Sequence, residues 1–373
     1  MKRPLLLEIL RTPALAAGFG PAQWELLLRQ ARSAGLHGAL PFLLEEAGVG
    51  PGVPAAARAH LDWLRTLSLH HGDNVRNEVR LIARALADPE GGGTGRPLIL
   101  LKGAAYLMAG LPNSPGRLFS DVDIMVPKPA LAQVEGALML HGWATTHHDA
   151  YDQRYYREWM HELPPLQHLR RGTVIDVHHA ILPETAALHP DPARLRAAAV
   201  DIAWPDGLAG DCPLQVLAPH DMVLHSALHL FWDGEFDHGL RDLFDLHRLL
   251  QAFGERPGFW EGLPVRAREL ELELPLFYAL RFAARLFGTQ VAPEATAALA
   301  AAAPSRARLA LMDALFLRAL LPMHASCADA FDRPARFALY IRGNWLRMPP
   351  LLLARHLFHK AFLSPRAEAK EEA

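Results

Sequence analysis

Two short apolar runs, joined by a brief helical stretch, limit what this chain can fold into more than any other feature. The first covers residues 98–101, and the second covers residues 121–126, where one valine separates Asp121 from Asp123. Side chains two positions apart in a strand point to the same face, so we expect two carboxylates side by side. Two negative charges this close are unfavourable unless a cation or water lies between them. Hard oxygen ligands favour Mg²⁺ or Mn²⁺, whereas two solvated carboxylates on an exposed strand are the simpler alternative.

A third carboxylate comes from a β-branched segment further along the chain. Residues 173–178 follow a turn-like Arg-Arg-Gly sequence and contain Asp176. If this strand pairs beside the second apolar run, Asp176 shares the cation site with Asp121 and Asp123. Two cations about 3.5–4 Å apart could then stabilise both the entering and the leaving oxygen of a phosphoryl transfer. The additional strand therefore favours a metal site over an exposed pair of carboxylates.

The order of these motifs resembles a known enzyme family. Leu-Lys-Gly, then an arginine, then Ser-Asp-Val-Asp-Ile-Met-Val is similar to the bacterial nucleotidyltransferase-like family of the DNA polymerase β-type nucleotidyltransferase superfamily. The resemblance implies an NTP donor, expected to be ATP, and an acceptor hydroxyl that Asp176 helps to activate. The Lys-Gly pair replaces the Gly-Ser of better-known members, and Ala104 stands in the place of that serine. One hydroxyl contact to the nucleotide phosphates is therefore missing.

Four residues near the aspartates are candidates for contact with the nucleotide. Gly103 permits close approach of the backbone to a ligand, and N–H groups of the following helix can face phosphate oxygens. Lys102 could neutralise a triphosphate or extend into solvent. Arg117 could support a phosphate, pair with one of the aspartates, or simply belong to a Pro/Gly-rich loop. Ser120 could donate to a phosphate or end that loop.

Composition indicates which classes of acceptor and which cellular compartment to expect. A formal net charge of −2 provides no basic field for nucleic acid, so a small-molecule or protein acceptor is favoured over a polynucleotide. Cys212 and Cys327 are the only cysteines, so neither a disulfide framework nor a zinc–thiolate site is indicated, and we expect a cytoplasmic protein. Glu8 and Arg11 interrupt the N-terminal apolar run, and no apolar stretch approaches the roughly 20 residues of a membrane span.

Helical, mixed and helical regions follow one another, which predicts an α+β fold with a small mixed sheet. We expect a helical region over 1–90, a nucleotidyltransferase core over 97–181 and a helical region over 215–363, and the helical flanks could contact a protein partner. A Gly-rich break precedes the core, and a charged tail begins near residue 365. The remaining pattern within the core predicts one helix over 128–141 and strands over 143–151 and 162–169.

A different enzyme class fits one dipeptide. His220-Asp221 matches the signature of HD-type metal phosphohydrolases, with His179 and either Asp242 or Asp245 as partners. An HD site lies within an all-helical core rather than after strands. A two-residue match is also a weak signal, so this interpretation ranks below nucleotidyl transfer.

The same helical segment has a simpler interpretation. Asp221, His225 and His229 recur at intervals of four residues, so they share one helix face that could line a cleft without binding a metal. The following segment resembles the acceptor-side helix of the nucleotidyltransferase family. There, Arg241 or Asp242 could face the cleft, although an Arg–Asp surface pair is an equal alternative.

A non-enzymatic function also fits the sequence. The fold could serve as a binding or assembly module, and the absence of the serine favours this interpretation. Retention of all three aspartates favours catalysis, because clustered buried acids are costly to keep without a cation. His178 and His179 follow Asp176 closely and could orient a carboxylate or an acceptor, or could be structural histidines. We therefore expect a metal-dependent nucleotidyltransferase.

Overall fold

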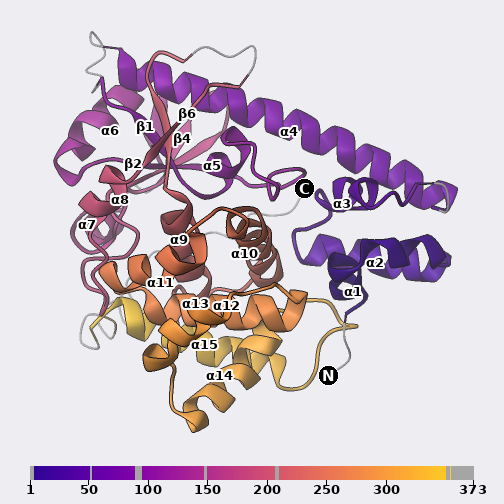
Figure 1. The fold of residues 1–373 in the computed structure, drawn as a ribbon. Coiled ribbons are helices and arrows are strands. Elements are labelled where there is room, and N and C mark those ends of the chain that lie inside the picture. Colours follow the sequence, from indigo (N-terminus) through magenta and orange to yellow (C-terminus); the bar gives the residue numbers. More distant parts are fainter. Residues whose placement is uncertain are drawn as a thin grey trace.

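A seven-stranded mixed sheet lies beside helices from both ends of the chain (Figure 1). The computed structural model describes residues 4–50, 53–88, 95–146, 149–205, 210–349 and 353. This architecture is the α+β fold that the sequence predicts. The main helices are α1 (Leu5–Arg11), α2 (Pro21–Ser33), α3 (Leu40–Glu46), α4 (Ala55–Ala87), α5 (Lys102–Met108), α6 (Leu131–Leu140), α7 (Ala150–Trp159), α8 (Pro192–Ala197), α9 (Pro219–Trp232), α10 (Gly239–Gly254), α11 (Phe259–Glu269), α12 (Glu273–Phe287), α13 (Pro293–Ala298), α14 (Arg306–Ala319) and α15 (Asp332–Arg347).

The strand that carries the Asp-x-Asp motif lies at the centre of the sheet. The strands are β1 (Leu98–Leu100), β2 (Asp121–Met125), β3 (Trp143–Thr145), β4 (Leu166–His168), β5 (Val174–His178), β6 (Val200–Ile202) and β7 (Leu214–Val216). Their order is β3-β4-β5-β2-β1-β7-β6. β2 pairs antiparallel with β1 and parallel with β5, and this register sets Asp123 directly opposite Asp176. The two acid-bearing strands are therefore neighbours.

Two strands come from a part of the chain where the sequence pattern predicts none. β6 and β7 follow the expected core, and β7 pairs parallel with β1. Each has only three residues, which is too short for an alternating pattern of apolar side chains to be recognised. Because α9 begins at Pro219, β7 also brings α9 next to the sheet.

The strand expected over 143–151 is wrong beyond Thr145. It ends there, and α7 begins at Ala150. Trp143, Thr145, Thr146 and Tyr151 give residues 143–151 a strand-like composition. The helix is supported instead by pairs four residues apart, including an ion pair of 2.8 Å between Arg154 and Glu158. The helix expected over 128–141 is confirmed in its α6 portion and begins with a 3-10 turn, Lys128–Ala130.

The strand expected over 162–169 is interrupted. Glu162 forms an isolated bridge with His178, and regular pairing resumes only in β4. Pro164 and Pro165 separate the two parts because neither residue has an N–H group to donate to a ladder. Most of the predicted Gly-rich break and the whole charged tail after residue 365 lie outside the described residues.

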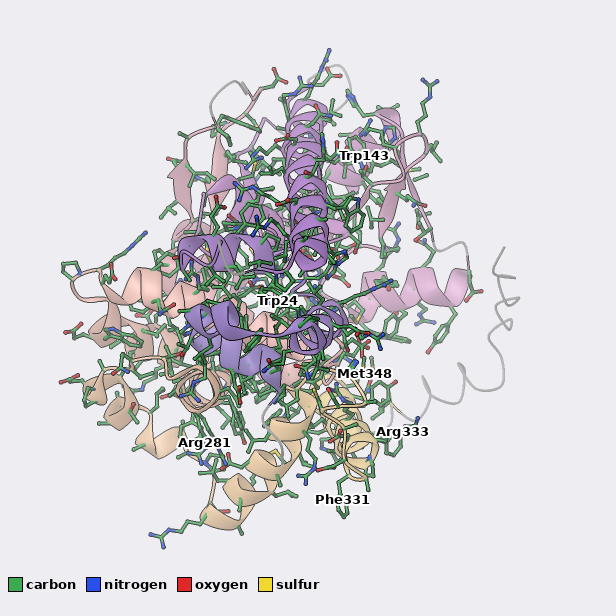
Figure 2. All side chains as sticks on the ribbon, turned by 90° about the vertical axis from the view of Figure 1, so that its right-hand side faces the viewer. Trp24, Trp143, Arg281, Phe331, Arg333 and Met348 are labelled. Carbon is green, nitrogen blue, oxygen red and sulfur yellow. The ribbon has the colours of Figure 1, made fainter. Side chains whose placement is uncertain are left out.

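The helices enclose the sheet and build the main apolar core. α4, 33 residues long, contacts α5 and α6 over the sheet, while α9 contacts α10, α11, α12 and α15. Buried aromatic rings fill the space around α9, among them Phe231, Tyr278 and Phe316. Figure 2 places Trp24 near the middle of the molecule and Phe331 at its lower end, with exposed fractions of 1% and 65%. Within the described part of the chain, no helix is both long and apolar enough to span a membrane.

Candidate active site

Three carboxylates converge on one region of the sheet. Asp121 and Asp123 lie two positions apart in β2, and Asp176 lies opposite Asp123 in β5. One carboxylate oxygen from each of the three lies within 4.8 Å of the others. The intervening Val122 is buried, with 4% of its surface exposed, as alternation in a strand predicts. The structure thus brings together the three acids that the sequence assigns to a metal site.

Asp123 is the most enclosed of the three and has two cationic or polar partners. Its Oδ1 accepts hydrogen bonds from Lys102 Nζ at 2.9 Å and from His178 Nε2 at 2.8 Å. Burial alone would raise the pKa of Asp123, but the Lys102 ammonium and the His178 imidazole outweigh burial and hold it well below its usual range. Asp123 is therefore a carboxylate at neutral pH. Because both partners bind Oδ1, Oδ2 is the oxygen that could bind a cation.

For Asp121 and Asp176, nearby positive charges do not outweigh the effect of burial on the pKa. Burial, followed by the charge of Asp123, raises the pKa of Asp121. Burial, Asp123 and Glu162 raise the pKa of Asp176 to about 7. The Oδ1 atom of Asp176 is buried and has no hydrogen-bond partner among the described residues. An unpartnered buried polar atom is unfavourable by about 1–3 kcal/mol, and a bound cation would remove that penalty.

The turn between β1 and α5 directs Lys102 towards the acids. Lys102 has a φ of +45°, which is uncommon for a residue with a Cβ atom and unfavourable by about 1–3 kcal/mol. Its side chain lies against Asp123 rather than extending into solvent, and Asp123 raises the pKa of Lys102 despite burial, which would lower it. At Gly103, an added Cβ would lie 2.5 Å from Arg117 Nη1 and 2.9 Å from the Phe119 ring, so a larger residue would force these side chains to shift.

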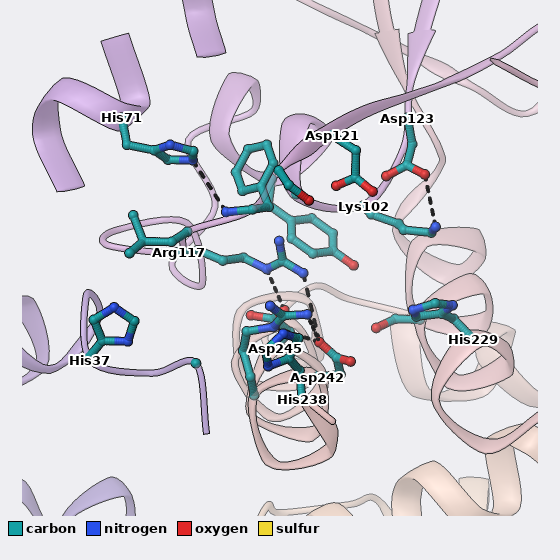
Figure 3. Close-up of a pocket in the computed structure, with 18 of the residues that line it drawn as sticks. His37, His71, Lys102, Arg117, Asp121, Asp123, His229, His238, Asp242 and Asp245 are labelled. Atoms are coloured by element: carbon teal, nitrogen blue, oxygen red, sulfur yellow. Dashed lines mark hydrogen bonds and ion pairs between the residues drawn. The ribbon is translucent and has the colours of Figure 1, made fainter. Parts of the chain in front are cut away.

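A cavity of about 620 Å³ opens beside Asp121 and Asp123 (Figure 3). The N-terminal helical region supplies His37 and His71 to its wall, while α9 and α10 supply the opposite side. The polar and charged residues that line it are His37, His71, Lys102, Arg117, Ser120, Asp121, Asp123, Ser226, His229, His238, Arg241, Asp242 and Asp245. Asp176 is not among the residues that line this cavity. All four predicted nucleotide contacts, Gly103 included, do line it.

Arg117 connects the loop before β2 to α10. Its Nε donates to Asp245 Oδ2 at 2.7 Å, and its Nη2 lies 4.0 Å from Asp242 Oδ1. Burial would lower the pKa of Arg117, but these two acids outweigh that effect and raise it. The guanidinium also lies over the Tyr106 and Phe119 rings, with 5.6 Å to each ring centroid. Arg117 therefore pairs with the acids of α10 rather than with Asp121 or Asp123.

The His220-Asp221 dipeptide is engaged elsewhere. Arg266 donates to both carboxylate oxygens of Asp221, at 2.6 and 2.8 Å, and Asp221 is 0% exposed. His220 Nε2 lies 3.0 Å from the carbonyl oxygen of Phe259, and the two rings stack. Asp242 lies 2.9 Å from Arg241 Nη2, and Asp245 accepts from Arg117. These contacts give the dipeptide a structural role and argue against an HD-type centre.

Two functional candidates near the acids have only a weak signal in the sequence. His161 and Glu162 lie on the irregular segment before β4, where Glu162 bridges to His178. Glu162 Oε2 lies 3.2 Å from His178 Nδ1. The sequence suggests that His178 could orient a carboxylate, and its bond to Asp123 matches that role. No spacing rule connects His161 and Glu162 to that strand, because the pairing depends on tertiary structure.

The site geometry agrees with a family comparison. A family described as uncharacterised nucleotidyltransferases matches residues 20–288, which include all three aspartates and the helices that line the cavity. The chain belongs to this nucleotidyltransferase family. The resemblance predicted from the Lys-Gly and Asp-x-Asp motifs is therefore confirmed. No curated protein matches the chain.

Proposed function

We propose that this protein transfers an NMP from an NTP, with ATP as the first donor to test, to a hydroxyl of a small molecule or a protein. The observation that carries the proposal is the group of three carboxylates whose ligand oxygens lie within 4.8 Å of one another. Within it, Asp176 Oδ1 is buried and has no partner among the described residues. Three carboxylates are hard oxygen donors, which fit Mg²⁺ or Mn²⁺. Bound cations would hold the triphosphate and offset charge at the reacting phosphorus.

Each residue of the site would have a separate role in the transfer reaction. The acceptor oxygen forms a bond to the α-phosphorus of the nucleotide, the bond from that phosphorus to the bridging oxygen breaks, and pyrophosphate leaves. Asp121 and Asp123 would hold the cation that accompanies the nucleotide. Asp176 would receive the hydroxyl proton as the general base. Lys102 would keep Asp123 ionised and provide positive charge near the phosphates.

The cavity supports a polar acceptor of modest size. Its volume of about 620 Å³ is in the range of small-molecule sites, and its far wall carries Arg241, Asp242 and His238 on or next to α10. Alternating positive and negative side chains favour an acceptor with hydroxyl and ionic groups. The overall charge provides no attraction for a polynucleotide.

Transfer of label from the nucleotide tests the proposal directly. The purified protein, Mg²⁺ and each α-labelled NTP would be incubated with a metabolite and protein extract, and label would be sought on both fractions. We expect incorporation and equimolar pyrophosphate with the wild type, and loss of both with Asp121→Asn. Asp62→Asn, on the exposed side of α4, is the matched control and should behave as the wild type. If the wild type binds Mg·NTP but never exceeds Asp121→Asn in pyrophosphate release, a binding module replaces the enzyme.

A further inference from the structure

A second group of metal-binding side chains lies next to the three aspartates. It consists of His161 and Glu162 from the segment before β4 and His178 from the end of β5. One ligand atom from each lies within 4.8 Å of the other two. The backbone holds them in place, because Glu162 bridges to His178 and His179 N donates to the carbonyl oxygen of His161 at 2.8 Å. This group is called the histidine cluster below.

The histidine cluster contains nitrogen atoms without partners. The Nδ1 atoms of His161 and His178 are both buried, and neither has a hydrogen-bond partner among the described residues. His178 itself is only 2% exposed. Its Nδ1 lies 3.2 Å from Glu162 Oε2 without the geometry of a hydrogen bond. Two nitrogens and one carboxylate oxygen therefore face a common space.

The contact to Asp123 determines which nitrogen of His178 is free. His178 Nε2 donates its proton to Asp123 Oδ1 at 2.8 Å, so Nδ1 is the ring nitrogen that faces Glu162. A lone pair facing a carboxylate oxygen is repulsive unless a cation or a second proton lies between them. Histidines that bind metals usually donate their other N–H group to a carboxylate in this way. Asp123 therefore has the same position relative to His178 as the carboxylate that hydrogen-bonds the second ring nitrogen of a zinc-bound histidine.

We propose that His161, Glu162 and His178 bind a borderline transition cation of the Zn²⁺ type, separate from the cations of the carboxylate site. Two imidazoles and one carboxylate are a ligand set that suits Zn²⁺, whereas Mg²⁺ prefers oxygen alone. Ligand atoms around tetrahedral zinc lie about 3.3 Å apart, given bonds of about 2.0–2.1 Å. The contact of 3.2 Å between His178 and Glu162 is close to this length, and a ligand nitrogen of His161 lies within 4.8 Å of both. Three protein ligands leave a fourth position for water or another ligand.

Zinc titration in excess Mg²⁺ tests this site without any assay of activity. The chelator-treated full-length protein would be titrated with Zn²⁺ by calorimetry, with Mg²⁺ present to fill the carboxylate site. We expect one Zn²⁺ per chain in the wild type and also in Asp121→Asn, because Asp121 lies outside the histidine cluster. His161→Ala should weaken Zn²⁺ binding by at least about 100-fold, which is the upper end of the effect of losing an outer-shell partner. His70→Ala, an exposed histidine of α4, is the matched control and should bind as the wild type.

A measurement on the unaltered protein covers the case in which His161→Ala does not fold. X-ray absorption at the zinc edge should then detect two imidazole nitrogens in the wild-type Zn²⁺ complex. The proposal is overturned if the wild type binds no stoichiometric Zn²⁺ in excess Mg²⁺. It is equally overturned if His161→Ala folds and keeps wild-type affinity, or if absorption detects oxygen ligands alone.

Discussion

Two acids of this protein have opposite surroundings. Asp221, in α9, has both carboxylate oxygens bonded to Arg266. Asp176, in β5, has a buried Oδ1 without a partner among the described residues and lies beside two further carboxylates. The first acid has both oxygens paired with an arginine, whereas one oxygen of the second has no partner among the described residues.

A search for short motifs alone would rank Asp221 above Asp176 as a metal ligand, and the contacts of the two residues favour the opposite order. His220-Asp221 is a literal match to a metal-binding signature, yet Arg266 neutralises the aspartate completely. Asp176 belongs to no such dipeptide. Whether a buried acid is a structural residue or a ligand therefore depends on the pairing of its oxygen atoms, which a motif does not contain.

The largest expected effect separates Asp176 from Asp123 within the proposed site. Asp176→Asn should lower the rate of nucleotidyl transfer by about 10²–10⁴-fold, equivalent to roughly 3–5 kcal/mol of barrier, because it removes the proton acceptor. Its affinity for Mg·NTP should change little. Asp123→Asn should weaken both binding and turnover, because it removes a ligand used in ground and transition states alike. Calorimetry and pyrophosphate release measure the two quantities, and equal losses of binding in both variants would contradict separate roles.

The second prediction tests the satisfied acid. Arg266→Met leaves Asp221 charged, buried and unpaired, so the free energy of unfolding should fall by about 3–5 kcal/mol. The double variant Asp221→Leu with Arg266→Met should recover most of this loss, because neither charge remains. Denaturant unfolding followed by circular dichroism gives both values. Arg268→Met is the control on the same helix, since its partner Glu273 is a surface pair and the change should be below about 1 kcal/mol.

The third prediction uses pH to detect the unsatisfied acid in metal-free protein. The pKa of Asp176 is raised to about 7 in the folded state from an ordinary value of 3.8, so the folded state binds more protons between these values. Stability contributed by this group is therefore present at low pH and lost as pH rises towards 7. Between pH 5 and pH 7, wild-type protein in EDTA should lose about 2 kcal/mol relative to Asp176→Asn. Identical pH dependence in the two proteins would show that Asp176 ionises normally.

The smallest effect is expected for an acid that is paired but partly exposed. Asp313 binds Arg281 at 2.6 Å and Arg285 at 2.9 Å, and the side chains of the two arginines are 35% and 46% exposed. Hydrogen bonds from Arg281 lower the pKa of Asp313. Because solvent screens the pair, Asp313→Asn should reduce the free energy of unfolding by only about 1 kcal/mol or less. A loss as large as that of Arg266→Met would mean that burial does not control these contributions.

The elements that the sequence predicts well are those with strong local signals. β2 and β5 are short, largely apolar runs that carry the acids, and the helical regions have clear apolar periodicity. The sequence permits the β2–β5 pairing without requiring it, and the structure contains that pairing. β6 and β7 could not be predicted, since three residues contain too little periodicity and their positions depend on β1.

Partners in the candidate site were harder to predict than its acids. The site residues Asp121, Asp123 and Asp176 come together as expected. Arg117 and Asp245 are far apart in sequence, so the sequence around one of them does not predict that it pairs with the other. The histidine cluster depends on a single β-bridge after a proline pair, and only the folded chain contains that arrangement.

The pairing of β7 with β1 determines how much of the chain is needed to protect the edges of the sheet. A fragment that ended near residue 181 would leave one side of β1 unpaired, because β7 supplies its hydrogen-bond partners. An unpaired edge strand is a template for association with other chains. Such a fragment would expose the apolar residues Leu98 and Leu100 next to open backbone groups. A soluble excised version of the sheet therefore has to extend through Val216 and include β6, which covers the far side of β7.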